Sequence, residues 1–174
     1  TGREVARIMR ALGMNIQAIN RSGKTDEPVD FIGTLDDVDH VLAASDVVVI
    51  TLALTSATER LLEAAQLKEM KPDAILINVA RGEIVDEDDL YAHLIAHPDF
   101  TACLEAWWVE PIRHGRFETA HPFLDLPNVI ASPHNSAMTD GALITAAERG
   151  AENVLRFLNG ETPRFIAGDD VRMA

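Results

Sequence analysis

An almost continuously apolar run at residues 74–79 constrains the fold of this chain more than any other stretch. Runs of this kind are typical of a strand that is covered on both faces in a parallel sheet. Asn78 interrupts the run, Arg81 and Gly82 end it, and Asp86 begins an acidic helix start. Arg81 is therefore predicted just past the carboxyl end of a buried strand, where open α/β sheets bind ligands. From these residues alone, an exposed loop arginine that closes the strand is an equal alternative.

Strand-like and helix-like segments alternate along the chain. We predict strands at residues 15–20, 29–32, 46–52, 74–79, 100–106 and 129–131. We predict helices from the first residues to Leu12 and at about 35–44, 57–70, 87–96 and 140–158, with a long loop at 107–127. The run at residues 47–50 is the most β-branched and indicates a central strand. Alternation at this spacing predicts right-handed crossovers and an α/β fold with a mostly parallel, doubly wound sheet.

Composition excludes several classes of protein. The chain has 174 residues, of which 47% are hydrophobic, so one domain with a core is expected. A net charge of -13 argues against a nucleic-acid surface and against anionic membranes. The single cysteine, Cys103, excludes a disulfide framework and is expected to be a buried, inert thiol. No apolar run approaches the roughly 20 residues that span a bilayer, and no signal-peptide pattern opens the chain, so we expect a cytoplasmic protein.

Three ionisable residues, Arg81, Glu110 and His134, each follow a predicted strand and can therefore converge at one edge of the sheet. A histidine gives or takes a proton near neutral pH. A carboxylate beside it holds its orientation and favours its protonated form. A guanidinium binds a carboxylate through two hydrogen bonds and polarises a nearby carbonyl. Taken singly, the residues favour the non-functional interpretation, in which His134 is a loop histidine with a backbone partner and Glu110 is a solvated side chain.

Other candidate sites are weaker. We expect the remaining histidines to be solvated on helix surfaces or in the long loop: His40, His93, His97, His114 and His121. No grouping of cysteine, histidine and carboxylate has zinc spacing, so no metal is expected. No serine lies in a nucleophile elbow. The Trp107-Trp108 pair suits either the wall of a pocket or the core.

Several motifs, in order along the chain, carry a resemblance to a known family. They are NVARGEIVD at residues 78–86, Glu110-Pro111, and LPNVI at residues 126–130 followed by Pro133-His134. Together they resemble the D-isomer-specific 2-hydroxyacid dehydrogenases, over residues 1 to about 160. The resemblance implies that Arg81 binds the carboxylate and carbonyl of a 2-keto acid. It also implies that His134 is the general acid/base and that Glu110 pairs with it.

The same resemblance implies a Rossmann-like cofactor domain over residues 1–160. Thr1-Gly2 resembles the end of the Gly-rich turn G-x-G-x-x-G, with Gly2 as the third glycine, which lets helix and sheet pack closely. The first strand and the first two glycines would then precede residue 1. Residues 161–174 would be a tail that returns to a separate substrate domain. Without that strand and those glycines, we expect these 174 residues alone to lack turnover.

The resemblance also assigns cofactor contacts. The residues that would line the adenosine and pyrophosphate side are Leu52, Ala53 and Thr58. Those that would border the nicotinamide are Val79, Ala80, Arg81, His134 and Ser136. Glu105 stands where the family usually has an aspartate, which would accept a hydrogen bond from the nicotinamide carboxamide.

A second departure concerns the choice of cofactor. Asn20, Arg21 and Ser22 stand where NAD-specific members end the second strand with an aspartate. Loss of that negative charge removes the repulsion of a 2′-phosphate, and the guanidinium and hydroxyl suit phosphate oxygens. NAD(P) is therefore the expected cofactor, with a preference for NADP.

Three functions compete for this sequence. The first is the cofactor domain of an oxidoreductase that transfers hydride between NAD(P)H and a small 2-keto acid or D-2-hydroxy acid. The second is a nucleotide-sensing, corepressor-like binding module, and the third is a purely structural Rossmann-like domain. The intact Arg81, Glu110 and His134 favour the enzyme. The long helix before Gly160 and the Trp-rich loop suit a homodimer.

Overall fold

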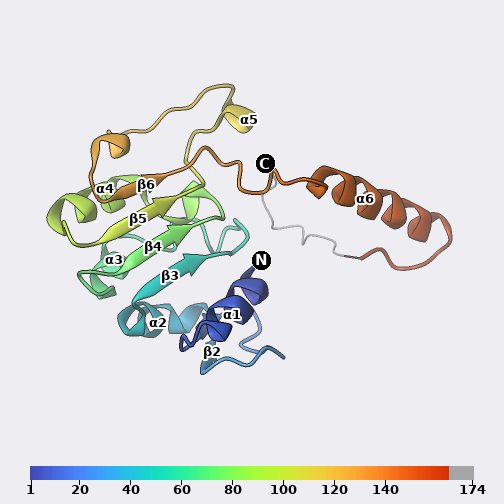
Figure 1. Cartoon of the computed structure of the whole chain (residues 1–174), viewed down its shortest axis with the longest axis horizontal. Helices are drawn as coiled ribbons and strands as arrows, with labels where there is room; N and C mark the ends of the chain where they lie inside the picture. Colours follow the sequence, from blue (N-terminus) through green and yellow to red (C-terminus); the bar gives the residue numbers. More distant parts are fainter. Residues whose placement is uncertain (165–174) are drawn as a thin grey trace.

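A computed structural model describes residues 1–164 and shows two parallel sheets flanked by helices (Figure 1). The larger sheet has the order β3-β4-β5-β6, and the smaller pairs β1 with β2. The strands are β1 (Gln17–Ile19), β2 (Phe31–Gly33), β3 (Val47–Ile50), β4 (Ile75–Asn78), β5 (Thr101–Leu104) and β6 (Val129–Ala131). Every pairing is parallel, which confirms the predicted Rossmann-like α/β architecture.

The helices connect the strands in the expected alternation. They are α1 (Gly2–Ala11), α2 (Val38–Ala44), α3 (Ala64–Glu69), α4 (Glu87–Ala96), α5 (Pro111–His114) and α6 (Ala142–Leu158). Single 3-10 turns occur at Leu35–Asp37, Gly82–Ile84 and Phe123–Asp125. α3 packs against both α2 and α4. The core between these helices and the larger sheet is made of fully buried apolar side chains such as Leu67, Leu76, Leu90 and Phe100.

Two side chains fix the elements around the site. The Asp86 carboxylate accepts the backbone N–H of Asp89 at 2.9 Å, which caps α4 at the predicted residue. The buried amide of Asn128 donates to three backbone carbonyls, those of Leu94, His97 and Phe100. Asn128 therefore ties the end of α4 and the approach to β5 to the start of β6.

The predicted helix at residues 57–70 is wrong over its first half, because only α3 is helical. Arg60 adopts a left-handed backbone conformation (φ 53°), and its N–H donates to the carbonyl of Glu83 at 2.8 Å. Backbone hydrogen bonds to the loop after β4 thus replace the helical ones, a tertiary effect that outweighs local helix propensity.

The prediction that residues 47–50 form a central strand is also wrong within residues 1–164. β3 pairs only with β4 and lies at the edge of the four-stranded sheet, while β4 and β5 are central. β-branched content therefore identified the strand but not its place in the sheet.

The last helix, α6, extends away from the body of the molecule (Figure 1). No α6 residue is buried, and its apolar side chains are among the most exposed of the described residues, including Leu143, Phe157 and Leu158. None of the helices within residues 1–164 has the length and apolar character that crossing a membrane requires.

Candidate active site

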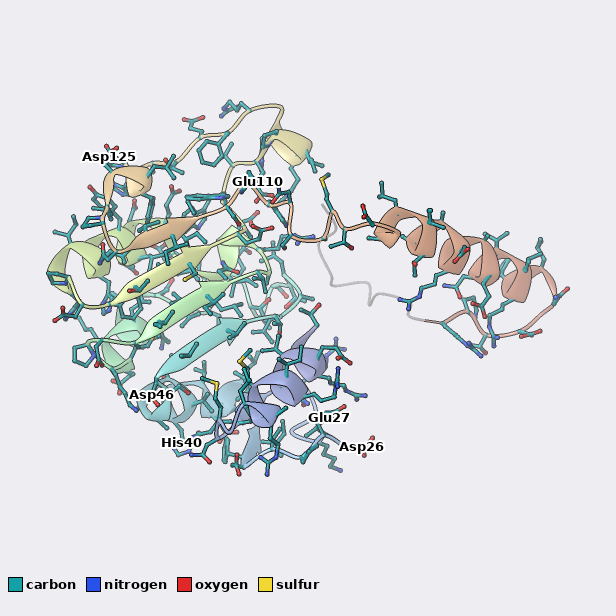
Figure 2. The ribbon with its side chains drawn as sticks, in the orientation of Figure 1. Asp26, Glu27, His40, Asp46, Glu110 and Asp125 are labelled. Carbon is teal, nitrogen blue, oxygen red and sulfur yellow. The ribbon has the colours of Figure 1, made fainter. Side chains whose placement is uncertain are left out.

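The three candidate residues follow three neighbouring strands of the larger sheet. Arg81 lies after β4, Glu110 after β5 and His134 after β6. Because these strands are parallel, their carboxyl ends meet at one edge, the side from which α6 leaves in Figure 1. Figure 2 shows Glu110 at this edge, beside α5.

Glu110 and His134 are in direct contact. Nδ1 of His134 lies 2.7 Å from Oε1 of Glu110, and the same oxygen accepts the backbone N–H of Trp107 at 2.7 Å. Because an ionised carboxylate only accepts, we assign the proton of this bond to Nδ1. Glu110 is only 7% exposed. The ring of His134 is thereby oriented by a fixed, buried carboxylate, and its Nε2 does not take part in this bond.

The backbone contributes to the same orientation. His134 has a left-handed conformation (φ 52°), which is uncommon for a residue other than glycine, and such outliers cluster at functional sites. The loop that precedes it is held by the indole of Trp107, whose Nε1–H donates to the carbonyl of Ser132 at 2.9 Å. Trp107 is buried, so of the two alternatives for this residue, pocket wall or core, the structure supports the core.

The Asn78 side chain fixes the loop that carries Arg81. The sequence alone did not predict this role for Asn78. The Asn78 side chain donates to the carbonyl of Arg81 at 2.8 Å and accepts the N–H of Ala80 at 3.0 Å. Its only sequence signal was a polar residue inside a buried strand. Such a residue must find partners, because an unpaired polar group in the core is costly.

The Arg81 side chain is held close to its own loop. Its Nη1 donates to the carbonyl of Ala80 at 2.7 Å. Within residues 1–164 it makes no hydrogen bond or ion pair to Glu110 or His134. The structure therefore brings Glu110 and His134 together and places Arg81 on the adjacent strand end.

Gly82 lets the Arg81 loop approach the segment that leads to Glu110. A Cβ at this position would lie 2.4 Å from the backbone carbonyl carbon of Trp107 and 2.5 Å from the backbone nitrogen of Trp108. Those atoms belong to the backbone and cannot turn away. A residue without a side chain is required for the two loops to pack this closely.

A cavity of about 210 Å³ opens beside this edge. It is lined by Ile77, Val79, Cys103, Leu104, Glu105, Ile130, Ala131, Ser132 and Ser136. Glu105 is buried, and its Oε1 accepts the N–H of Ser136 at 2.5 Å. Cys103 is only partly buried, which differs from the buried thiol that was predicted, and desolvation raises the pKa of its thiol. A mostly apolar cavity with one buried carboxylate fits a flat ring that bears a carboxamide, such as a nicotinamide.

The predicted pyrophosphate side lies at the start of α1. A Cβ on Gly2 would lie 2.8 Å from Oγ1 of Thr51, the residue after β3, so Gly2 makes the close helix-to-strand approach that was predicted. Thr1 is the N-cap residue of α1, and a helix N-terminus favours a phosphate. These features fit the diphosphate end of a dinucleotide.

The other residues predicted to contact the adenosine and pyrophosphate differ in burial and in hydrogen bonding. Leu52 is partly buried against the core, and Ala53 is exposed. The Thr58 hydroxyl is occupied, since it donates to the carbonyl of Ala53 at 2.7 Å and accepts the N–H of Thr55 at 2.8 Å. A direct cofactor contact by Thr58 stays a prediction.

The segment predicted to choose the cofactor forms a turn after β1. The Asn20 side chain accepts the N–H of Ser22 at 3.0 Å and donates to the carbonyl of Lys24 at 2.9 Å. Arg21 at the tip is exposed, and within residues 1–164 its guanidinium makes no hydrogen bond or ion pair. The turn thus leaves the guanidinium available to an external anion.

Three histidines, His93, His97 and His121, are less exposed than the solvated surface that was predicted for them. His93 on α4 is 8% exposed, its Nε2 has no partner among the described residues, and it packs beside His97 and Phe100. Burial, and secondarily the charge of His97, lowers its pKa from 6.5 to about 4. His121 lies in the long loop as predicted but is half-buried, and its Nε2 is 2.7 Å from Asp88 Oδ1. Helical periodicity did not mark His93 as part of the core.

Comparison with known proteins places this site in a family. Residues 1–136 match the model described as "D-isomer specific 2-hydroxyacid dehydrogenase, NAD binding domain". Glyoxylate reductase from Thermococcus onnurineus is 33% identical over 170 residues, which are 98% of this chain and 49% of that protein. Glyoxylate/hydroxypyruvate reductase B from Pectobacterium carotovorum is 41% identical over 125 residues, 72% of this chain and 38% of that protein. The chain thus spans about half the length, or less, of these curated relatives.

Solved structures agree in fold. A D-isomer specific 2-hydroxyacid dehydrogenase from Xanthobacter autotrophicus in complex with NADPH and MES matches with a TM-score of 0.82 and 30% identity, covering 94% of this chain and 64% of that one. D-lactate dehydrogenase with NAD+ from Lactobacillus jensenii matches with a TM-score of 0.77 and 29% identity, covering 96% and 52%. By the match of its sequence, its parallel sheet and its motifs, the chain belongs to the D-isomer specific 2-hydroxyacid dehydrogenase family and carries the NAD binding domain of that family.

Proposed function

We propose that this chain supplies the cofactor domain and the catalytic histidine of an NAD(P)-dependent reductase of small 2-keto acids, which runs in reverse on D-2-hydroxy acids. The observation that carries the proposal is the 2.7 Å contact between His134 and the buried Glu110, one strand from Arg81. A binding module without turnover needs no proton donor held by a buried carboxylate.

The described residues suit distinct steps of this reaction. NAD(P)H, when bound, supplies the hydride. Arg81 would bind the substrate carboxylate and polarise the keto oxygen. His134 would donate a proton from Nε2 to that oxygen, so that hydride and proton together convert the carbonyl to a hydroxyl. Glu110 would hold the imidazole in orientation and stabilise the cation that waits to donate.

We propose that the domain at residues 1–160 works with a separate substrate domain. The prediction that residues 161–174 return to that domain lies mostly outside the described residues, which end at Arg164. One more parallel strand is proposed to lie between β1 and β3. This is supported by the sheets themselves, because within residues 1–164 no strand pairs with β3 on the side away from β4. A strand there would join both sheets into one and make β3 central.

We propose NADPH as the preferred cofactor and a homodimer as the working assembly. The cofactor preference is supported by the exposed guanidinium of Arg21 on the turn after β1, which lacks an acidic side chain at residues 20–22. The dimer is supported by the exposed apolar side chains of α6, which a partner could cover. A cytoplasmic location is proposed because NAD(P)H reductions draw on the intracellular cofactor pool.

The deciding experiment measures oxidation of NADH and NADPH by the full-length protein with glyoxylate, hydroxypyruvate and pyruvate. Turnover of at least one acid, with a lower KM for NADPH than for NADH, supports the proposal. Tight NAD(P)H binding without turnover of any acid would instead support the corepressor-like module. Failure to bind either cofactor would support a structural domain.

A further inference from the structure

The four-residue helix α5 follows Glu110 directly and is closed at both ends by one pair of residues. The backbone N–H of His114 donates to the carbonyl of Glu110 at 2.8 Å. In return, the backbone N–H of Glu110 donates to Nδ1 of His114 at 3.0 Å. Gly115, in a left-handed conformation (φ 70°), then ends the turn. Glu110 is therefore held through both its carbonyl and its amide by a single residue four positions later.

This arrangement bears on the site because the side chain of Glu110 has its own fixed partners. Its Oε1 accepts from His134 and from the N–H of Trp107, both at 2.7 Å. A carboxylate that serves two donors at short distance tolerates little movement of its backbone. The bond from the Glu110 amide to His114 sets where that backbone lies.

The neighbouring residue ties α5 to the other half of the site. Arg113 forms an ion pair with Glu83, and both side chains are about three-quarters buried. Glu83 is two residues after Arg81, and its carbonyl accepts the N–H of Arg60 at 2.8 Å. The turn therefore connects the loop that carries Arg81 to the residue that orients His134.

We propose that His114 and Arg113 are positioning residues, with His114 fixing Glu110 against His134 and Arg113 fixing the loop of Arg81 relative to α5. This inference rests on the proposed function, since Glu110, His134 and Arg81 are the groups that it positions. His114 must act as the unprotonated acceptor at Nδ1, because the backbone amide can only donate. His114 forms its hydrogen bonds with Glu110, whereas Arg113 forms its ion pair with Glu83, so their effects on the reaction are separable.

The test of His114 compares two substitutions in the full-length protein. His114→Asn keeps an acceptor, because Oδ1 of asparagine lies near the place of Nδ1 in histidine. His114→Leu removes the acceptor and leaves the amide of Glu110 without a partner. We expect the Leu variant to lose on the order of tenfold in kcat, with KM for the keto acid and the Kd of NADPH unchanged. The Asn variant should stay within about twofold of the unmodified enzyme.

Two further measurements separate positioning from a general structural role. The amide proton of Glu110 should exchange slowly in the unmodified protein and the Asn variant, and at least tenfold faster in the Leu variant. In a Glu110→Gln background, His114→Leu should cost clearly less in kcat than it does alone, because the two changes act through one contact. Equal losses for Leu and Asn, full additivity with Glu110→Gln, or an unprotected Glu110 amide in the unmodified protein would overturn the role of His114.

Arg113→Gln tests the second half of the proposal, the position of the Arg81 loop. It should raise KM for the keto acid roughly threefold or more, with kcat and the protection of the Glu110 amide little changed. A fall in kcat with unchanged KM would overturn the role of Arg113. Absence of turnover in the unmodified protein would refute the proposed function, whereas the exchange of the Glu110 amide would still decide whether His114 fixes it.

Discussion

Oε1 of the buried Glu110 lies 2.7 Å from Nδ1 of His134, so the carboxylate holds one nitrogen of the ring and leaves Nε2 outside this contact. The two residues follow the neighbouring parallel strands β5 and β6. Their contact therefore depends on the register of the sheet as much as on their own side chains. Although residues 105–128 separate the two strands along the chain, their carboxyl ends lie at one edge because the strands pair in parallel.

Replacing the histidine should remove turnover without removing cofactor binding. His134→Asn is the appropriate change, because asparagine adopts the left-handed backbone found here more readily than alanine does. The loss in kcat should be about 10²–10⁴-fold, the typical contribution of general acid catalysis. Steady-state kinetics and NADPH titration check this, with the exposed His40→Asn as control. A variant that retained a tenth of its kcat would show that another group donates the proton.

The arginine after β4 is expected to require its planar shape. Arg81→Lys should raise KM for the keto acid and lower kcat together, each by about tenfold or more, because an ammonium cannot make the two-point contact of a guanidinium. Kinetics with a substrate that lacks the carboxylate supply the contrast, since this substrate should be affected much less. Near-normal constants for the Lys variant would return Arg81 to the role of a loop residue.

The turn after β1 should decide the cofactor. Arg21→Ala removes a guanidinium that has no partner among the described residues. The affinity for NADPH should fall about ten- to a hundredfold, the value of a charged hydrogen bond, while the affinity for NADH stays nearly constant. Calorimetric titration of both cofactors measures this. Tighter binding of NADH than of NADPH by the unmodified protein would refute the preference.

Adding one methyl group at Gly82 should destabilise the protein. In Gly82→Ala the new Cβ would meet the backbone of Trp107 at 2.4 Å, and separating the two loops costs on the order of 2 kcal/mol. Gly150→Ala is the matched control, because no atom lies within 4 Å of its added Cβ and the residue is inside α6. The control should gain about 0.5–1 kcal/mol from helix propensity. Urea unfolding of both variants gives the comparison, and equal stabilities would contradict the close approach.

The buried His93 should make folding sensitive to acid. Its pKa is lowered from 6.5 to about 4 in the folded protein, so the unfolded chain takes up the proton first. Stability is therefore complete above pH 6.5 and decreases as the pH falls toward 4. The loss should reach about 2–3 kcal/mol near pH 4.5, at 1.36 kcal/mol per unit of pKa. In His93→Leu this part of the pH dependence should disappear, whereas it should persist in His40→Leu.

Much of this architecture follows from local sequence. α4 begins after Asp86 and β6 covers residues 129–131, both as predicted, because a capping carboxylate and a short β-branched run act within a few residues. The alternation of elements also predicted the parallel pairing, since crossover connections permit little else. The edge that holds Arg81, Glu110 and His134 followed from the same reasoning.

What local sequence could not predict depends on contacts between distant segments. The segment at residues 57–62 is not helical because Arg60 and Leu62 form backbone hydrogen bonds with the loop at 83–86. His93 is buried because Phe100 and the end of α4 enclose it, although its spacing suits a surface position. His114 acquires its role only when its ring turns back to the amide of Glu110. None of these partners is visible as a pattern along the chain.

The guanidinium of Arg81 donates to the carbonyl of Ala80 on the same loop. The Asn78 side chain fixes this loop by donating to the carbonyl of Arg81. An arriving carboxylate would thus exchange with an acceptor that is already in place. The free energy gained is a difference between two hydrogen-bonded states rather than the full strength of a new contact. The expected consequence is an affinity for the acid that is lower than an unpaired Nη1 would give, with the remaining N–H groups of the guanidinium left to bind the carboxylate.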